Sequence, residues 1–142
     1  MNTSPPVSAQ YALEDQIGFK LRLANQKHLE IFAQKMPEVT PTQFAVLARL
    51  NGVGPCSQNK LGRLVGMDAA TTKGVVDRLR SKGMVHSTPS QTDMRRLEIS
   101  LTDDGAVFFA QAVERAAHIS RATTRNLTQR ETERLLALLD KL

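Results

Sequence analysis

The order of structural elements follows from residues 57–101, whose sequence is SQNKLGRLVGMDAATTKGVVDRLRSKGMVHSTPSQTDMRRLEISL. The spacing of leucine and valine in its first part predicts a short helix over about 58–66, which ends in a tight turn at a glycine. Asp68 is a good N-cap for a second helix over about 69–82, because its carboxylate can accept from free backbone N–H groups. Gly83 is expected to end this helix, because glycine is the usual residue just after a helix C-terminus.

Two short strands are predicted directly after the second helix, over residues 84–88 and 96–101. In the later strand apolar residues alternate with polar ones, so one face is buried and the other is in water. The segment between the strands, residues 89–93, consists of polar and turn-forming residues. Two helices joined by a tight turn and followed by a β-hairpin have the order of a winged helix-turn-helix, whose second helix enters the major groove of DNA.

Helical patterns flank this unit on both sides. Apolar residues recur at helical spacing over about 11–36, which predicts one long amphipathic helix. Residues 1–10 are expected to form a loose arm or the start of a partner contact. A capping box opens a helix over about 41–51. A further long helix is predicted over about 102–125, and a second capping box opens a leucine-rich helix at Thr128. The fold class is therefore mainly α with a small β-hairpin wing.

The basic charge of the chain is concentrated in its middle. The 142 residues carry a formal net charge of +5 at pH 7. Residues 1–39 hold four basic and four acidic side chains, and residues 102–142 hold six of each. Residues 40–101 hold nine basic and four acidic side chains, so they carry the whole excess. A basic segment of this kind favours an acidic partner such as nucleic acid.

Several classes of protein are excluded by what the sequence lacks. No run of about 18–20 apolar residues is present to span a bilayer, and we find no secretory signal, so we expect a cytoplasmic protein with no membrane partner. The single cysteine cannot form an internal disulfide or a metal cluster, and aromatic residues at 4% disfavour single-strand binding by stacking. Motifs of nucleotide-binding and hydrolytic enzymes are missing, so we predict no catalytic site, no metal and no cofactor.

The second helix and the hairpin carry the candidate DNA contacts. Small and hydrogen-bonding residues at the helix N-terminus fit a major groove without clashing. Arginines at the hairpin base gain from the negative potential of a narrow minor groove, and Asp93 is placed to hold Arg95 by a bidentate pair. Solubility alone explains Arg80 and Lys82 equally well. The predicted DNA-binding set is Ser57, Ala69, Ala70, Thr71, Thr72, Lys73, Asp77, Arg78, Asp93, Arg95 and Arg96.

Motifs along the chain resemble those of the MarR family of transcriptional regulators. They are Leu61-x-x-Leu64, then Thr71-x-x-x-Val75-Val76-Asp77-Arg78-Leu79-x-x-Lys82-Gly83-Met84-Val85, and then Asp93-x-Arg95 and Leu101-Thr102-x-x-Gly105. The resemblance covers about residues 12–142, and the last two motifs are fairly specific at this spacing. Many members have an arginine where this chain has Met94, so only Arg95 carries over directly and Arg96 is an additional cation.

The resemblance implies a homodimer built from a single domain over residues 1–142. Segments 1–36 and 102–142 would form the dimerisation helices, and segment 40–101 would form the DNA-binding lobe. Two recognition helices would then enter successive major grooves of a palindromic operator, about 34 Å apart, with the wings over minor grooves. The flanking helices also carry more apolar surface than one small domain can bury, which favours a dimer without reference to the family.

The resemblance also implies a small-molecule pocket between the dimerisation helices and the DNA-binding lobe. Residues 15–28 and 40–44 are similar to members that control aromatic-acid catabolism. Arg22 is a suitable partner for a carboxylate and the phenylalanines for a ring, although Arg22 also fits an ordinary surface role and His28 a core role. The predicted effector-binding set is Phe19, Arg22, Asn25, Gln26, His28 and Phe44.

These observations predict a repressor of an aromatic-compound catabolic or efflux operon, which a small aromatic carboxylate or its thioester releases from DNA. Two other functions fit the sequence. Cys56 precedes a helix N-terminus, where a thiolate would be stabilised, and this would suit a redox-responsive regulator. An architectural DNA binder that is indifferent to sequence would have the same basic centre.

Overall fold

The computed structural model describes Ser4 and residues 6–142, so residues 1–3 and 5 of the predicted N-terminal arm lie outside the described residues. Within the described part, no helix is both long and apolar enough to cross a membrane. The elements are, in chain order, α1 (Val7–Gln10), the 3₁₀ turn η1 (Leu13–Asp15), α2 (Ile17–Lys35), α3 (Pro41–Val53), α4 (Gln58–Val65), α5 (Ala69–Ser81), β1 (Val85–Pro89), β2 (Leu97–Leu101), α6 (Asp103–Thr123) and α7 (Gln129–Leu139).

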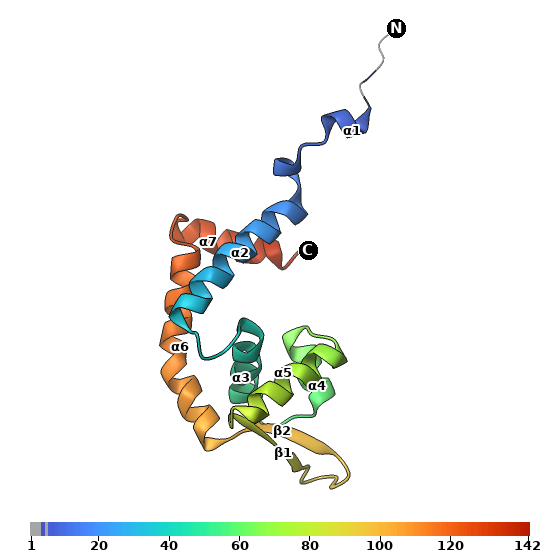
Figure 1. Cartoon of the computed structure of the whole chain (residues 1–142), viewed down its shortest axis with the longest axis vertical. Helices are drawn as coiled ribbons and strands as arrows, with labels where there is room; N and C mark the ends of the chain where they lie inside the picture. Colours follow the sequence, from blue (N-terminus) through green and yellow to red (C-terminus); the bar gives the residue numbers. More distant parts are fainter. Residues whose placement is uncertain (1–3, 5) are drawn as a thin grey trace.

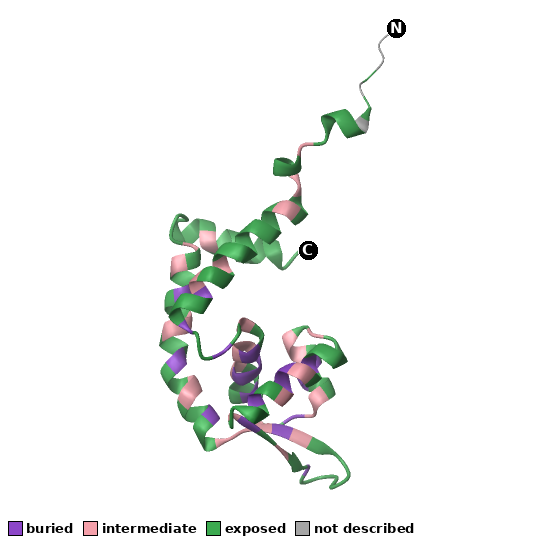
Figure 2. Cartoon of the chain, viewed as in Figure 1, coloured by how far each residue is buried: buried purple, intermediate pink, exposed green. Residues whose placement is uncertain are grey.

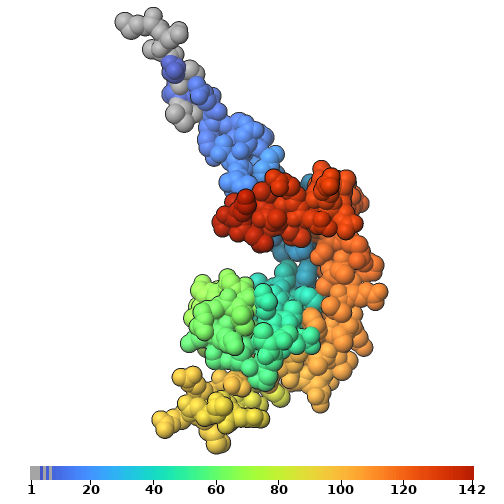
Figure 3. Space-filling model, turned by 180° about the vertical axis from the view of Figure 1, so that it is seen from behind, coloured from blue at the N-terminus to red at the C-terminus, as the bar shows by residue number. Residues whose placement is uncertain are grey.

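The chain forms two parts that meet where α3 packs against α6 (Figure 1). In one part, α2 packs against α6, and α7 folds back across the same end of the molecule. In the other part, which we call the lobe (residues 40–101), α3, α4 and α5 pack together and the β1–β2 hairpin projects from their base. Figure 3 shows a hollow between α7 and the lobe. The predicted winged helix-turn-helix, made of α4, α5 and the hairpin, is confirmed.

Side chains cap the helices where the sequence predicts caps. Thr40 Oγ1 accepts from the backbone N of Gln43 at 3.2 Å and Gln43 Oε1 accepts from the backbone N of Thr40 at 3.2 Å, which completes a capping box. Asp68 Oδ1 accepts from the backbone N of Thr71 at 2.7 Å, and this bond holds the pKa of Asp68 below its ordinary value. α4 ends at Gly66 with a φ of 73°, a left-handed conformation that glycine adopts without strain.

One hydrophobic core lies where α3, α4 and α5 meet, and it continues between α2 and α6 (Figure 2). Leu47, Leu61 and Leu79 are fully buried there. The close approach of α4 to α5 depends on Gly62, because a Cβ at this position would lie 2.7 Å from Thr72 Oγ1. The packing of the two helices of the helix-turn-helix therefore requires a residue without a side chain at this point.

The start of α6 is locked onto the segment that follows α5. Thr102 Oγ1 donates to Gly83 O at 2.6 Å and accepts from the backbone N of Gly105 at 3.0 Å. The backbone N of Thr102 donates to Met84 O at 3.0 Å. Gly105 is buried against the same carbonyl, and a Cβ there would lie 2.0 Å from Met84 O. The Leu-Thr-x-x-Gly motif is therefore a backbone-packing motif that fixes α6 relative to the wing.

The wing is a two-stranded antiparallel hairpin with an additional bridge at its base. Its register runs from Val85 opposite Leu101 to Pro89 opposite Leu97. Cys56 pairs with Ile99 of β2 through two backbone bonds, Cys56 N to Ile99 O at 3.1 Å and Ile99 N to Cys56 O at 2.7 Å. Because an isolated two-stranded hairpin is marginally stable in water, this bridge helps to hold the wing in place.

The predicted continuous helix over about 11–36 is wrong in its first part. Gln16 has an extended backbone, with φ −93° and ψ 134°, and α2 begins only at Ile17. The side chains of Leu13 and Ile17 are exposed, so packing within one chain does not hold the first turns in helical continuity with α2. The short α1 and η1 consequently project away from the body of the molecule (Figure 1).

Candidate nucleic-acid interface

The exposed side of α5 presents small and basic side chains towards its N-terminal end. Ala69, Ala70 and Thr71 are exposed, and the side chain of Lys73 is 69% exposed. Arg78 is exposed further along the helix. The opposite side of α5 lies in the core of the lobe. The helix can therefore approach a groove in DNA without disturbing the packing that positions it.

Thr72 does not belong to this surface, although we predicted it as a DNA contact. It is 1% exposed, and its Oγ1 donates to Asp68 O at 2.7 Å beside Gly62. The physical reason is the helical period, which places Thr72 on the same side of α5 as the buried residues Val75 and Leu79. Thr72 packs α5 onto α4, so its side chain is not available to DNA.

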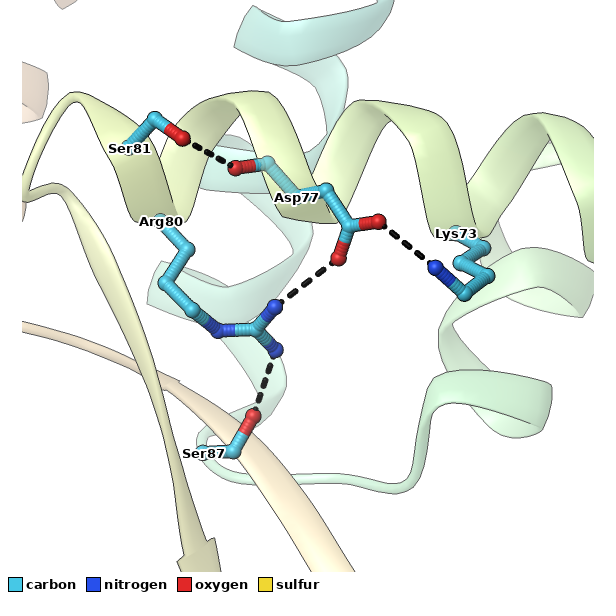
Figure 4. A network of polar contacts seen from close by, with 5 residues as sticks. All are labelled: Lys73, Asp77, Arg80, Ser81 and Ser87. Atoms are coloured by element: carbon cyan, nitrogen blue, oxygen red, sulfur yellow. Dashed lines mark hydrogen bonds and ion pairs between the residues drawn. The ribbon is translucent and has the colours of Figure 1, made fainter.

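Asp77 lies on the exposed side of α5 and is bonded to two cations (Figure 4). Its Oδ2 accepts from Lys73 Nζ at 2.8 Å and its Oδ1 accepts from Arg80 Nη1 at 2.8 Å. The bond from Lys73 is the main cause that holds the pKa of Asp77 below its ordinary value, so the carboxylate is ionised at neutral pH. Arg80 Nη2 donates to Ser87 Oγ at 2.7 Å. Arg80 thus connects α5 to strand β1.

The loop of the wing places two arginines in water. Asp93, Arg95 and Arg96 are all exposed. The predicted bidentate pair between Asp93 and Arg95 is wrong, because Asp93 Oδ1 accepts from the backbone N of Arg95 at 3.0 Å and Asp93 Oδ2 lies 3.8 Å from Arg96 Nε. An aspartate that accepts from the N–H group two residues ahead stabilises a turn. Asp93 therefore shapes the loop and faces Arg96.

The two residues that precede α4 have structural roles. Ser57 is half-buried, and its Oγ accepts from the backbone N of Lys60 at 3.2 Å as the N-cap of the helix. Cys56 is 4% exposed, and burial raises the pKa of its thiol. A raised pKa opposes the thiolate that peroxide-sensing chemistry requires. The structure therefore gives no support to the redox-responsive alternative.

The predicted effector residues fall into two groups. In the first half of α2, Arg22, Asn25 and Gln26 are exposed and Phe19 is half-buried. The guanidinium of Arg22 lies 5.5 Å from the centroid of the Phe19 ring. His28 follows six residues after Arg22, about 9 Å further along the helix axis. Within a single chain these residues of the first half of α2 are largely exposed to water. A closed pocket around them therefore requires a further protein surface that covers them.

The second group belongs to a row of aromatic rings that crosses from α2 through α3 to α6. His28 contacts Phe32 edge-on at a centroid distance of 6.2 Å, and Phe32 contacts Phe44 at 6.4 Å. Phe44 stacks on Phe109 at 5.5 Å and 28°. The Nδ1 atom of His28 lies 2.9 Å from Thr123 Oγ1, within hydrogen-bond distance. Phe44 thus lies at the junction between the lobe and the helices α2 and α6, and His28 lies between α2 and α6, next to Phe32.

Contacts of charged side chains that we did not predict connect the segment before α3 to α6 and to the end of α5. Glu38, between α2 and α3, accepts from Arg115 of α6 through both carboxylate oxygens, at 3.0 and 2.7 Å. These bonds are the main cause that holds the pKa of Glu38 below its ordinary value. Lys82, the C-cap of α5, donates to Glu38 O. The residues in these contacts lie 77 and 44 positions apart in the chain, so local sequence patterns do not reveal them.

The role of Arg80 was also missed, because solubility explained this cation as readily as DNA binding. The sequence did contain a signal. Asp77 follows Lys73 by four residues and precedes Arg80 by three, and charged side chains at these two spacings meet on a helix. The bond from Arg80 to Ser87 had no such signal. It depends on the direction in which β1 leaves the end of α5.

Comparison with known proteins supports the same class of molecule. The model of the MarR family matches residues 39–97, which run from the segment before α3 to the first residue of β2. The HTH-type transcriptional repressor NicR of Pseudomonas putida is 33% identical over 143 residues, in an alignment that covers 99% of this chain and 90% of NicR. The similarity therefore extends over the lobe and over the helices that flank it.

Two solved structures share the fold over most of the chain. A probable transcriptional regulator from Pseudomonas aeruginosa is 44% identical, with a TM-score of 0.89, and the match covers 92% of this chain and 98% of that one. BpsR of Bordetella bronchiseptica, whose DNA binding is regulated by 6-hydroxynicotinic acid, is 32% identical, with a TM-score of 0.87 and coverage of 92% and 95%. The prediction of a regulator and not an enzyme is confirmed, because this chain belongs to the MarR family of DNA-binding transcriptional regulators.

Proposed function

We propose that the chain is a dimeric repressor of an aromatic-compound catabolic or efflux operon, and that a small aromatic carboxylate or its thioester relieves its binding to a palindromic operator. The exposed side of α5 carries the DNA-binding part of this proposal. Small residues and cations stand there on a helix whose other side is packed in the core. Such a helix fits a major groove and keeps its position while it does so.

In this proposal α5 contacts base edges with its small N-terminal residues and phosphates with its cations. The arginines of the wing lie over the adjacent minor groove, where the negative potential is greatest if the groove is narrow. Ser57 and Asp93 act indirectly, as an N-cap and a turn residue. The proposed contacts are Ala69, Ala70, Thr71, Lys73 and Arg78 of α5, and Arg95 and Arg96 of the wing.

A second copy of the chain is the proposed partner of the helices outside the lobe. α7, which the structure describes in full, buries none of its residues within one chain. Leu136 is 60% exposed and Leu142 is 80% exposed, and Ile17 of α2 is 64% exposed. Large apolar residues left in water at helical spacing favour an interface. We infer that segments 17–36 and 102–142 dimerise and that the lobe binds DNA.

The aromatic row supports the effector part of the proposal. It lies where the lobe meets α2 and α6, so a ring that inserts beside Phe44 would affect how these parts pack. Arg22 offers a cation for a carboxylate from the exposed half of α2. BpsR, a relative over nearly the whole chain, has its DNA binding regulated by 6-hydroxynicotinic acid, an aromatic carboxylic acid. The similarity favours the same chemical class of effector here.

Mobility shifts with the DNA upstream of the chain's own gene test this function. We expect operator binding that is lost when the palindrome is scrambled, by a difference of about 4–10 kcal/mol. The addition of 6-hydroxynicotinic acid or benzoic acid should weaken the complex, whereas a non-aromatic acid such as acetic acid should not. Binding that survives scrambling would indicate an architectural protein, and a complex that no aromatic acid weakens would remove the effector from the proposal.

Replacing Arg22 with alanine should lower the affinity for an aromatic acid by about tenfold or more, because a charge-assisted bond to the carboxylate is lost. Calorimetry measures this affinity. Operator binding without the acid should stay at the wild-type level, since Arg22 is exposed on α2. Lys27→Ala removes an exposed cation from the same helix and is the matched control. Equal affinities of the two variants would show that Arg22 is not the carboxylate partner.

A further inference from the structure

Asp77 stands out on the surface that we place in the major groove. It is the single acidic residue of α5, a helix that the structure describes in full and that also carries Lys73, Arg78 and Arg80. DNA phosphates repel a carboxylate, so an ionised aspartate on this surface lowers the affinity for any duplex. General affinity for DNA therefore does not account for its presence.

The two cations hold the carboxylate of Asp77 in one orientation. Each carboxylate oxygen has two lone pairs, and the bonds from Lys73 and Arg80 use one on each oxygen. Arg80 is itself held at its other nitrogen by Ser87 of β1 (Figure 4). Asp77 thus keeps acceptor capacity on a side chain whose direction is already fixed, and 44% of the side chain is exposed.

The side of α5 next to Asp77 allows a close approach to DNA. Ala70 and Gly74 precede Asp77 by two turns and by one turn on the same side of the helix. A Cβ at Gly74 would come no nearer to another atom than 3.4 Å, to the flexible end of Arg78, so space inside the protein does not demand a glycine here. A helix without large side chains at these positions can sink further into a groove.

We propose that Asp77 determines operator specificity by accepting a hydrogen bond from an exocyclic amino group in the major groove, that of cytosine N4 or adenine N6. The inference rests on the proposed placement of α5 in the major groove. Guanine and thymine present acceptor atoms at the corresponding edge, and a carboxylate opposite an acceptor is repelled. Asp77 therefore rejects keto bases at one position of each half-site, and this rejection is a source of specificity.

Selection from random duplexes by the wild-type dimer and by Asp77→Asn tests the proposal. Asparagine keeps the shape of the side chain but can donate as well as accept. The wild-type protein should select an amino-bearing base about tenfold over guanine or thymine at one position of each half-site, because a mismatched contact typically costs that factor or more. The variant should lose this preference at that position and keep the others. An unchanged preference in Asp77→Asn overturns the proposal.

Two further variants separate a base contact from a change in charge. Glu98→Gln removes an acidic charge from β2 of the same lobe and should leave the preference as it is. Arg80→Lys keeps the charge but replaces the two guanidinium nitrogens that bond Asp77 and Ser87 with a single ammonium nitrogen, so the preference should weaken about threefold. A loss of preference in Glu98→Gln would contradict the base contact.

The selection also distinguishes this inference from the proposed function. If the wild-type protein enriches no sequence, the assignment of a sequence-specific repressor fails. If it enriches a palindrome that Asp77→Asn enriches identically, the repressor stands and only the role of Asp77 fails.

Discussion

Replacing Gly105 with alanine is expected to lower the free energy of unfolding by about 3 kcal/mol or more, because overpacking at a rigid contact forces the backbone to move. A Cβ at this position would lie 2.0 Å from Met84 O and 2.9 Å from Met84 C. The same carbonyl accepts from the backbone N of Thr102, so a shift that relieved the clash would also break this bond. Denaturant unfolding of the purified protein measures the effect.

Gly52→Ala is the matched control for this substitution. Gly52 lies in α3, and a Cβ there would meet no atom within 4 Å. Alanine has the higher helix propensity, so this variant should be more stable than the wild-type protein by up to about 1 kcal/mol. If Gly105→Ala unfolded at the wild-type denaturant concentration, the contact between α6 and Met84 would be looser than the structure shows.

Replacing Arg95 with alanine is expected to weaken operator binding by about 1–3 kcal/mol, which is roughly 5- to 150-fold. In the proposed complex the exposed guanidinium gains from the potential of a narrow minor groove, and the variant would lose this gain. The fold should not change, because the side chain lies in water on the wing loop. Titration of labelled operator DNA at fixed salt concentration gives the affinity.

Arg96→Ala provides the comparison for Arg95. Its guanidinium lies 3.8 Å from Asp93, so part of its charge is already balanced and its removal should cost less. A larger loss of affinity in Arg96→Ala than in Arg95→Ala would reverse the assignment of the two arginines. Wild-type affinity in Arg95→Ala would show that the wing does not contact the operator as proposed.

Features set by neighbouring residues were predictable from the sequence. The capping boxes at Thr40 and Thr128, the N-cap Asp68 and the turn at Gly66 all lie where local rules place them. Thr72 shows how one local rule can mislead, because its side chain type suggested a DNA contact. The helical period had already placed it beside Val75, and the period decides which side chains are buried.

Features that depend on distant segments were not predictable. Glu38 meets Arg115 and Lys82 only because the fold brings the ends of α2, α5 and α6 together. The interruption at Gln16 likewise depends on what surrounds Ile17, whose apolar side chain suggests a buried helix but is exposed in a single chain. Hydrophobic periodicity shows that a surface is apolar, but it does not show whether the same chain covers that surface.

The bridge between Cys56 and Ile99 anchors the wing at one end only, at its base. Its root is fixed to the core through Ile99, which is 3% exposed, whereas the span from residue 91 to residue 97 lies entirely in water. Deflection of that span disturbs no core packing. If the wing arginines contact DNA as proposed, they can follow grooves of different width, whereas α5, which is packed in the core, fits only a groove of one shape.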